Sequence, residues 1–236
     1  MKRFLGILFL LVIVAAGVCA YFFPGIPYKY KCTHDLELTD SIWENIPENI
    51  PPLPADYSDY SNFGVRITAW NDMEPVRTND KTKAKWLNSD EDCWIGITEE
   101  HLSESDDFLD RTGITHEALD RYCKAVEKTT PENQYEFTKL VASLTMDDFD
   151  IHDFKNSKTF YLLMKTKNEL YLGSKMFYCA DGVGFRGYFY TKHAPEANQG
   201  YMIIYPDRDK RTRYTIEISV FDYYQAFAMA ESIKLT

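Results

Sequence analysis

The chain has 236 residues, a formal net charge of −10 and an aromatic content of 15%. The aromatic content argues against a disordered chain. The acidic balance argues against nucleic acid as a partner, because negative surfaces repel phosphates, and it would attract a basic protein.

An apolar run without charged residues begins at Phe4 and ends at Phe23, after Lys2 and Arg3. A helix over these 20 residues would be about 30 Å long, which matches the hydrocarbon core of a bilayer. We therefore predict a transmembrane anchor over residues 1–23, whose membrane span is bounded by Phe4 and Phe23.

Two alternatives to a retained anchor stay open. A cleaved signal peptide would have a shorter apolar region and an A-x-A-like site, which Val18-Cys19-Ala20 matches poorly. Cys19 also allows a lipid anchor, although Ala16-Gly17-Val18 before it is a poor lipobox. All three place the rest of the chain beyond the membrane, so we predict a single-pass inner-membrane protein with a periplasmic C-terminal domain.

Four cysteines follow the apolar run, namely Cys32, Cys93, Cys123 and Cys179. An even number in an oxidising compartment allows two disulfides, with three pairings. Free cysteines can equally be small buried hydrophobes, and both interpretations stay open. The sequence has no CxxC motif and does not support a thioredoxin-like redox site or a zinc knuckle.

Residues 24–60 contain six prolines and are predicted to form a tether, because proline blocks regular structure. The exported domain is expected over residues 61–236. Its first part should contain strands at 65–70 and 93–98, a long polar loop at 71–92 and an exposed acidic segment at 99–110.

Three amphipathic helices are predicted next. The first covers residues 115–128 and is capped by Thr115. The second begins at Thr130-Pro131, and the third is capped by Ser157 and ends before Gly173. The expected buried faces of the second and third helices consist of Phe137, Leu140, Val141 and Leu144, and of Phe160, Leu163, Met164 and Tyr171.

The last part is rich in predicted strands, with a hairpin turn at Asp181-Gly182 and a final helix from Asp222 to about Ile233. Consecutive strands joined by short turns pair antiparallel. The predicted fold class is therefore α+β, with an antiparallel sheet packed by helices and preceded by one N-terminal transmembrane helix. The expected strands are 176–179, 188–192, 201–205 and 213–220, the last with Tyr214, Ile216, Ile218 and Val220 on one face.

The last 60 residues, with antiparallel strands and a helix that closes on Glu231-Ser232-Ile233-Lys234-Leu235, resemble exported proteins of the PsbP/Mog1-like α/β/α sandwich group. That group holds many non-catalytic members, so the resemblance implies a binding or accessory role. The helices at 115–172 depart from the simplest form of the group.

Three patterns could carry chemistry, and each has a plainer interpretation. Gly182 to Gly187 matches G-x-G-x-x-G, but it leads into a predicted strand and indicates a hairpin. The acidic stretch Asp147–Asp153 lacks the glycine and glutamate of an EF-hand and is interpreted as a solvated turn. His116 and Cys123 share a helix face about 10 Å apart, too far for a nucleophile and its base. We expect no catalytic residue, metal site or cofactor from these patterns.

One basic cluster stands out, and it consists of Arg208, Lys210, Arg211 and Arg213. It lies in a predicted turn, where it could contact an acidic partner or lipid headgroups or simply be solvated. The sequence favours a membrane-anchored binding or accessory protein, including an immunity protein that neutralises a basic toxin. An envelope hydrolase with paired carboxylates and a small-molecule-binding domain stay open as alternatives.

Overall fold

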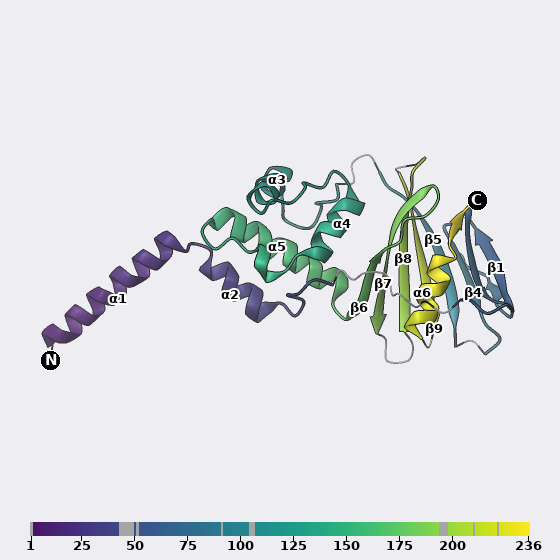
Figure 1. The fold of residues 1–236 in the computed structure, drawn as a ribbon, viewed down its shortest axis with the longest axis horizontal. Coiled ribbons are helices and arrows are strands. Elements are labelled where there is room, and N and C mark those ends of the chain that lie inside the picture. The colour runs from purple at the N-terminus through teal and green to yellow at the C-terminus, as the bar shows by residue number, and fades with distance from the viewer. Residues whose placement is uncertain are drawn as a thin grey trace. The chain divides into compact units, whose positions relative to one another are not determined.

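The structure is a computed structural model that describes residues 2–42, 50, 52–90, 92–103, 107–193, 198–209, 211–220 and 222–236. The chain divides into two compact units. Unit 1 contains Met1–Ser41 and Asp107–Leu172, and unit 2 contains Ile42–Asp106 and Gly173–Thr236. Figure 1 shows the helices of unit 1 and the strands of unit 2.

Unit 1 is helical, and its central helix is α5 (Phe154–Tyr171). The helices α2 (Ile26–Asp35), α3 (His116–Ala125) and α4 (Gln134–Ser143) each pack against α5. The other elements are α1 (Lys2–Phe22) and the short 3-10 helix η1 (Met146–Asp148). The predicted apolar faces are confirmed, because Phe137, Leu140, Val141, Leu144, Phe160, Leu163, Met164 and Tyr171 are all buried.

The predicted helix starts are correct for α3 and wrong for α4 and α5. Thr115 caps α3 through a hydrogen bond from the Ala118 N–H. Asn133 caps α4, and Asp153 caps α5 by accepting the Asn156 N–H at 2.8 Å. Several residues near the start of each helix have side chains that can cap it. Asn133 and Asp153 are the caps because their backbone is extended and their side chains accept an N–H of the first turn. Ser157 instead lies buried inside α5.

The expected tether at residues 24–60 is wrong in part, because it contains α2 and the first part of β1 (Tyr57–Asn62). Pro27 lies in the first turn of α2, where its missing N–H costs no helical hydrogen bond. Residues 43–49 and 51 lie outside the described residues.

Unit 2 contains a seven-stranded antiparallel sheet in the order β3-β4-β5-β9-β8-β7-β6 and a three-stranded sheet in the order β1-β2-β10. The predicted loop at 71–92 is wrong, because two strands at one edge of the larger sheet, β3 (Glu74–Val76) and β4 (Lys83–Leu87), lie within it. The remaining strands are β2 (Val65–Trp70), β5 (Trp94–His101), β6 (Ser174–Cys179), β7 (Phe185–His193), β8 (Asn198–Pro206), β9 (Thr212–Val220) and β10 (Lys234–Leu235).

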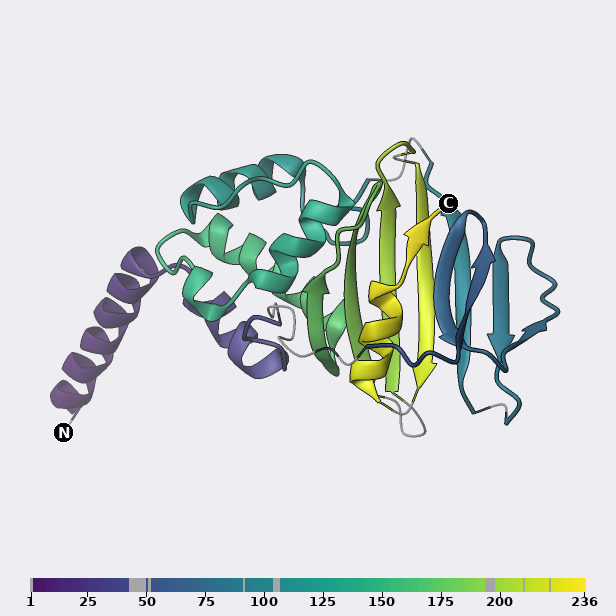
Figure 2. The ribbon, with the colours of Figure 1, turned by 45° about the vertical axis from the view of Figure 1, so that its right-hand side comes forward.

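The core of unit 2 lies on one face of the larger sheet. Helix α6 (Tyr223–Glu231) packs on β7, β8 and β9 and also contacts β2. Figure 2 shows α6 lying along the strands. Asp222 caps α6 as predicted, and the helix ends at Glu231, two residues before the expected end. Tyr214, Ile216, Ile218 and Val220 of β9 all face this core, which confirms their predicted alternation and the α+β class with an antiparallel sheet.

The described side chains of α1, from Ile7 to Phe22, are exposed and do not contribute to a core. From Ile7 to Val14 every large apolar side chain is more than half exposed. Among the described residues no single helix is long and apolar enough to cross a membrane. The bent pair formed by Ile7–Phe22 and Ile26–Asp35, at 83° to each other, does reach the required length and composition.

Candidate functional site

A pocket of about 410 Å³ lies in unit 2, where three hairpin turns meet. The β1–β2 turn contributes Phe63, the β6–β7 turn contributes Val183, and the β8–β9 turn contributes Arg208 and Asp209. Tyr214 of β9 and residues 235–236 complete the lining. The lining is mainly apolar and carries a cation and an anion, a composition that suits small ligands or single side chains of a partner.

The β1–β2 turn holds Phe63 in an uncommon conformation. Phe63 and Gly64 have φ angles of 52° and 74°, so both central residues of this two-residue turn are left-handed. Such a turn matches the twist of a hairpin, but its first position usually holds Asn or Gly. The Asn62 side chain accepts the Phe63 N–H at 2.9 Å and supports the turn. An aromatic ring is thereby held at the pocket at a cost in backbone strain.

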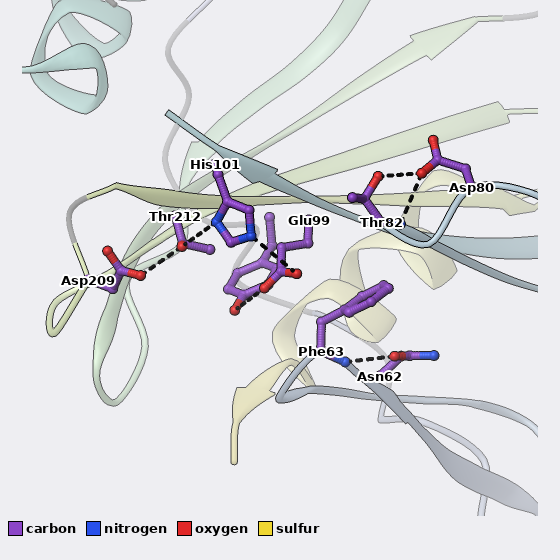
Figure 3. A network of polar contacts seen from close by, with 9 residues as sticks. Asn62, Phe63, Asp80, Thr82, Glu99, His101, Asp209 and Thr212 are labelled. Atoms are coloured by element: carbon purple, nitrogen blue, oxygen red, sulfur yellow. Dashed lines mark hydrogen bonds and ion pairs between the residues drawn. The ribbon is translucent and has the colours of Figure 1, made fainter. Parts of the chain in front are cut away.

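A polar network adjoins the pocket and shares Asp209 and Tyr214 with it (Figure 3). The Thr212 hydroxyl donates to Asp209 Oδ2 at 2.7 Å, and His101 Nδ1 lies 3.2 Å from the Thr212 oxygen. On the other side, Glu99 lies 3.7 Å from His101 Nε2 and accepts the Tyr214 hydroxyl at 3.3 Å. The β5–β9 register explains the grouping, because His101 pairs with Thr212 and Glu99 with Tyr214.

The electrostatics of the network fix the protonation of two of its groups. Hydrogen bonds from the Thr212 hydroxyl and from the Arg211 N–H lower the pKa of Asp209, which is therefore an anion at neutral pH. Burial and the Glu99 carboxylate raise the pKa of Tyr214, so its hydroxyl stays protonated. Tyr214 can therefore donate a hydrogen bond but cannot act as a base.

This geometry does not activate a nucleophile. A hydroxyl nucleophile must direct its proton at a general base. The Thr212 proton is directed at Asp209, a weak base because its pKa is lowered, and Thr212 is buried with 4% exposure, out of reach of a substrate. The network instead holds Asp209 and Tyr214 in place at the pocket.

The three described residues of the predicted basic cluster do not form one surface. Arg208 lines the pocket and has no ion-pair partner among the described residues. Arg213 lies on the face of β9 that points away from the core of unit 2, and it forms an ion pair with Glu100. Burial opposes the charge of Arg213, yet Glu100 and Tyr205 hold its pKa above the usual value. Arg211 is exposed at the turn, and Lys210 lies outside the described residues.

The other patterns that the sequence singled out have structural roles. Gly182 to Gly187 forms the β6–β7 hairpin, as predicted, and a side chain at Gly182 would meet the Phe185 ring. His116 pairs with Asp107 at 2.8 Å, whereas Cys123 is fully buried.

The acidic stretch at 147–153 is used in caps and ion pairs. Asp148 pairs with Lys128 at 2.9 Å and accepts the Thr145 N–H at the same distance. Asp153 caps α5, and Asp150 accepts the His152 N–H at 3.0 Å. Within the described part of the chain no group of three or more His, Cys, Asp or Glu side chains could hold a metal ion.

The five cysteines all lie in described parts of the chain, and none of them forms a disulfide there. Cys32, Cys93 and Cys123 are buried, and burial raises their pKa values to about 12, 11 and 11. Cys179 is partly exposed and Cys19 is exposed on α1.

The sequence did not predict the roles of Phe63, Val183, Tyr214 and His101. Nothing in the local sequence brings His101 near Thr212, whereas the β5–β9 register pairs the two residues. The Phe-Gly pair at 63–64, just before the predicted strand at 65–70, was the one local sign of the β1–β2 turn. The chain matches no protein-family model and no curated protein significantly.

Proposed function

We propose that the chain is a membrane-anchored binding protein, in which α1 crosses the bilayer and unit 2 offers the pocket to a partner on the far side. The observation that carries the proposal is the exposure of α1. A helix that is apolar all round must be buried in protein or in lipid, and the described side chains of α1 are not buried in protein. The 21 residues of α1 give a length of about 30 Å.

Binding is preferred to catalysis because the described lining of the pocket does not supply a pair of reacting groups. One carboxylate, Asp209, lines it, whereas a hydrolase with an acid pair needs two carboxyl groups about 5–9.5 Å apart across a cleft. The resemblance of the last 60 residues to PsbP/Mog1-like proteins, many of them non-catalytic, points the same way.

The partner is proposed to be a basic protein. After Lys2 and Arg3 are set aside, 24 basic and 36 acidic residues remain, so the exported part carries a formal charge near −12. This charge would accelerate encounter with a cationic surface. An immunity protein that covers a basic toxin is one form of this function, with the inner membrane as its location.

A small ligand is the second candidate, and the pocket favours it. Phe63 and Val183 offer apolar surface, and Arg208 offers a positive charge beside them. The matching ligand would combine an apolar part with a carboxylate or another anionic group. Arg208→Gln should then weaken binding of such a ligand, whereas capture of a basic protein would be unaffected or improved.

Three measurements test the proposed function. Intact mass of the protein from native membranes separates a retained α1 from cleavage and from lipid attachment at Cys19. Leu11→Lys with Val14→Lys should release the protein from alkali-washed membranes, whereas Val183→Lys, at a side chain 96% exposed in unit 2, should not. Co-purification from detergent-solubilised membranes should recover a basic partner in stoichiometric amount, and isolation of the chain alone would contradict the binding role.

A further inference from the structure

The end of α1 is fixed to the helical unit by residues that are distant in sequence. His152 Nδ1 lies 2.9 Å from the Phe22 carbonyl oxygen, which can only accept, so this nitrogen carries the proton. The Gly25 N–H donates to the Ile151 carbonyl at 2.9 Å. Gly25 is buried so closely against Ser157 that no side chain would fit there. The apolar helix is therefore bound to the start of α5 and is not a free tether.

Large apolar side chains are exposed around this junction. We call them the junction belt, and they come from the end of α1, from α2 and from the first residue of α5. Its members are Tyr21, Phe22, Phe23, Ile26, Tyr30 and Phe154. Their exposed fractions run from 39% for Phe23 to 80% for Tyr21. Exposed apolar clusters of this kind mark interaction sites.

Phe154 shows that the belt is not confined to the segment after the predicted span. It is the first residue of α5, is 50% exposed, and its ring lies 5.3 Å from that of Tyr28 on α2. Because α2 is bent 83° away from α1, the belt lies across the end of the apolar helix. Aromatic rings at this level are typical of the interface between headgroups and acyl chains.

Cations surround the belt. Lys29 and Lys31 of α2 and Lys155 and Lys158 of α5 are exposed. Lys31 lies over the Tyr28 and Tyr161 rings at 5.7 and 5.5 Å, so its stem lies on aromatic surface while its charge stays in solvent.

The acids just before α5 are occupied by hydrogen bonds within the protein. Asp153 accepts the Asn156 N–H, and Asp150 accepts from the Asn156 amide and the His152 N–H. Apolar rings flanked by cations match the acyl boundary and the phosphates of a lipid headgroup layer.

We propose that the helical unit rests on the bilayer surface through the junction belt, with Phe154 and Tyr30 at the headgroup boundary. The proposal rests on the function proposed above, because it takes α1 as the membrane span. Its occupant is lipid, since the belt continues the exposed apolar surface of α1 and is bordered by positive charge. A consequence is that the orientation of the helical unit is set by the membrane.

Depth-dependent quenching tests the proposal on the full chain in vesicles of phosphatidylcholine brominated either near the headgroups or deep in the acyl chains. Single tryptophans are introduced as Leu11→Trp, Phe154→Trp, Tyr30→Trp and Leu172→Trp. The unsubstituted chain provides the background of the four native tryptophans. Leu172 is the matched control, because it is 48% exposed and follows the opposite end of α5, about 27 Å from Phe154.

The expected result is that the tryptophans at 154 and 30 lose emission, more with shallow than with deep bromines. The tryptophan at 172 should keep its emission, and the one at 11 should lose most with deep bromines. Quenching at 11 but not at 30 and 154 would overturn the belt and leave the anchor standing. Equal quenching at 172 would also overturn it. Absence of quenching at 11 would contradict the membrane anchor itself and the belt with it.

Discussion

Lys167 is the residue with the most unusual environment in unit 1. It is fully buried in α5, and its ammonium donates to the Leu144 carbonyl at 2.7 Å and to the Asp40 carbonyl. Burial lowers its pKa to about 8, although Asp40 and Asp148 act in the opposite direction. A neutral amine still has two N–H groups, enough for both carbonyls.

The free energy of unfolding of unit 1 should therefore rise between pH 8 and about 10. In this window the unfolded chain keeps the lysine proton, whose usual pKa is about 10.4, while the folded chain loses it. The gain is at most about 1.4 kcal/mol per pH unit, and it is lost as the pH falls through 8. Urea unfolding of the full chain in detergent, followed by helical circular dichroism, measures this slope. Lys167→Met should flatten it, and an unchanged slope in that variant would assign the effect to other groups.

The thiols give a second prediction at the scale of single residues. A maleimide should modify the folded chain at Cys179, and at Cys19 where detergent allows access. Cys32, Cys93 and Cys123 should stay unmodified, because they are buried and their raised pKa values leave little thiolate at neutral pH. After unfolding without reductant, all five cysteines should react with the maleimide, and intact mass counts the groups added. If only Cys19 reacted in denaturant, the two disulfides that the cysteine count allows would be present.

At the scale of elements, the junction between α1 and α2 depends on the absence of a side chain at Gly25. A Cβ there would lie 2.1 Å from Ser157 Oγ and 2.9 Å from the Ile151 carbonyl oxygen. Its φ of −79° suits alanine, so Gly25→Ala tests crowding alone. We expect a loss of about 1–3 kcal/mol in unfolding free energy, measured by urea unfolding in detergent. Gly17→Ala is the control, because a Cβ at Gly17 would have no neighbouring atom within 4 Å, and a similar loss there would exclude crowding as the cause.

Elements with a strong local signal could be predicted from the sequence. The alternation of β9 and the capping residues Thr115 and Asp222 were correct. The weak elements were missed because long-range contacts stabilise them. The sequence of α2 is polar, and its helix is held by Tyr28 against Phe154 and Tyr161 of α5. In β4 only Ala84 and Trp86 are buried, too short an alternation to separate a strand from a loop.

The candidate site was less predictable than the fold. The turn that contains Arg208 was expected, but the pocket also needs the β1–β2 turn, which lies more than 100 residues earlier in the chain. The polar network depends on the β5–β9 register, which pairs His101 with Thr212. Alternation within one strand shows which residues share a face, but it does not identify the partner strand.

At the scale of the whole molecule, unit 1 interrupts the sheet of unit 2. The chain leaves unit 2 after β5, forms α3, α4 and α5, and returns at β6. The described core cluster of unit 2 nevertheless comes from segments of unit 2 itself, with β2, β9 and α6 as the main contributors. A unit with its own core can fold alone, so unit 2 should not need the helices between β5 and β6.

We therefore expect residues 42–106, joined to 173–236 by a Gly/Ser linker of about 30 residues, to fold cooperatively. The linker must be long because β5 and β6 run in the same direction and lie four strands apart, about 19 Å across the sheet. Trp86 is 8% exposed and reports on this core by fluorescence during urea unfolding. One sharp transition with blue-shifted native emission would establish unit 2 as an autonomous domain. A broad transition with dye-binding apolar surface would show that the helical segment is required to complete the fold.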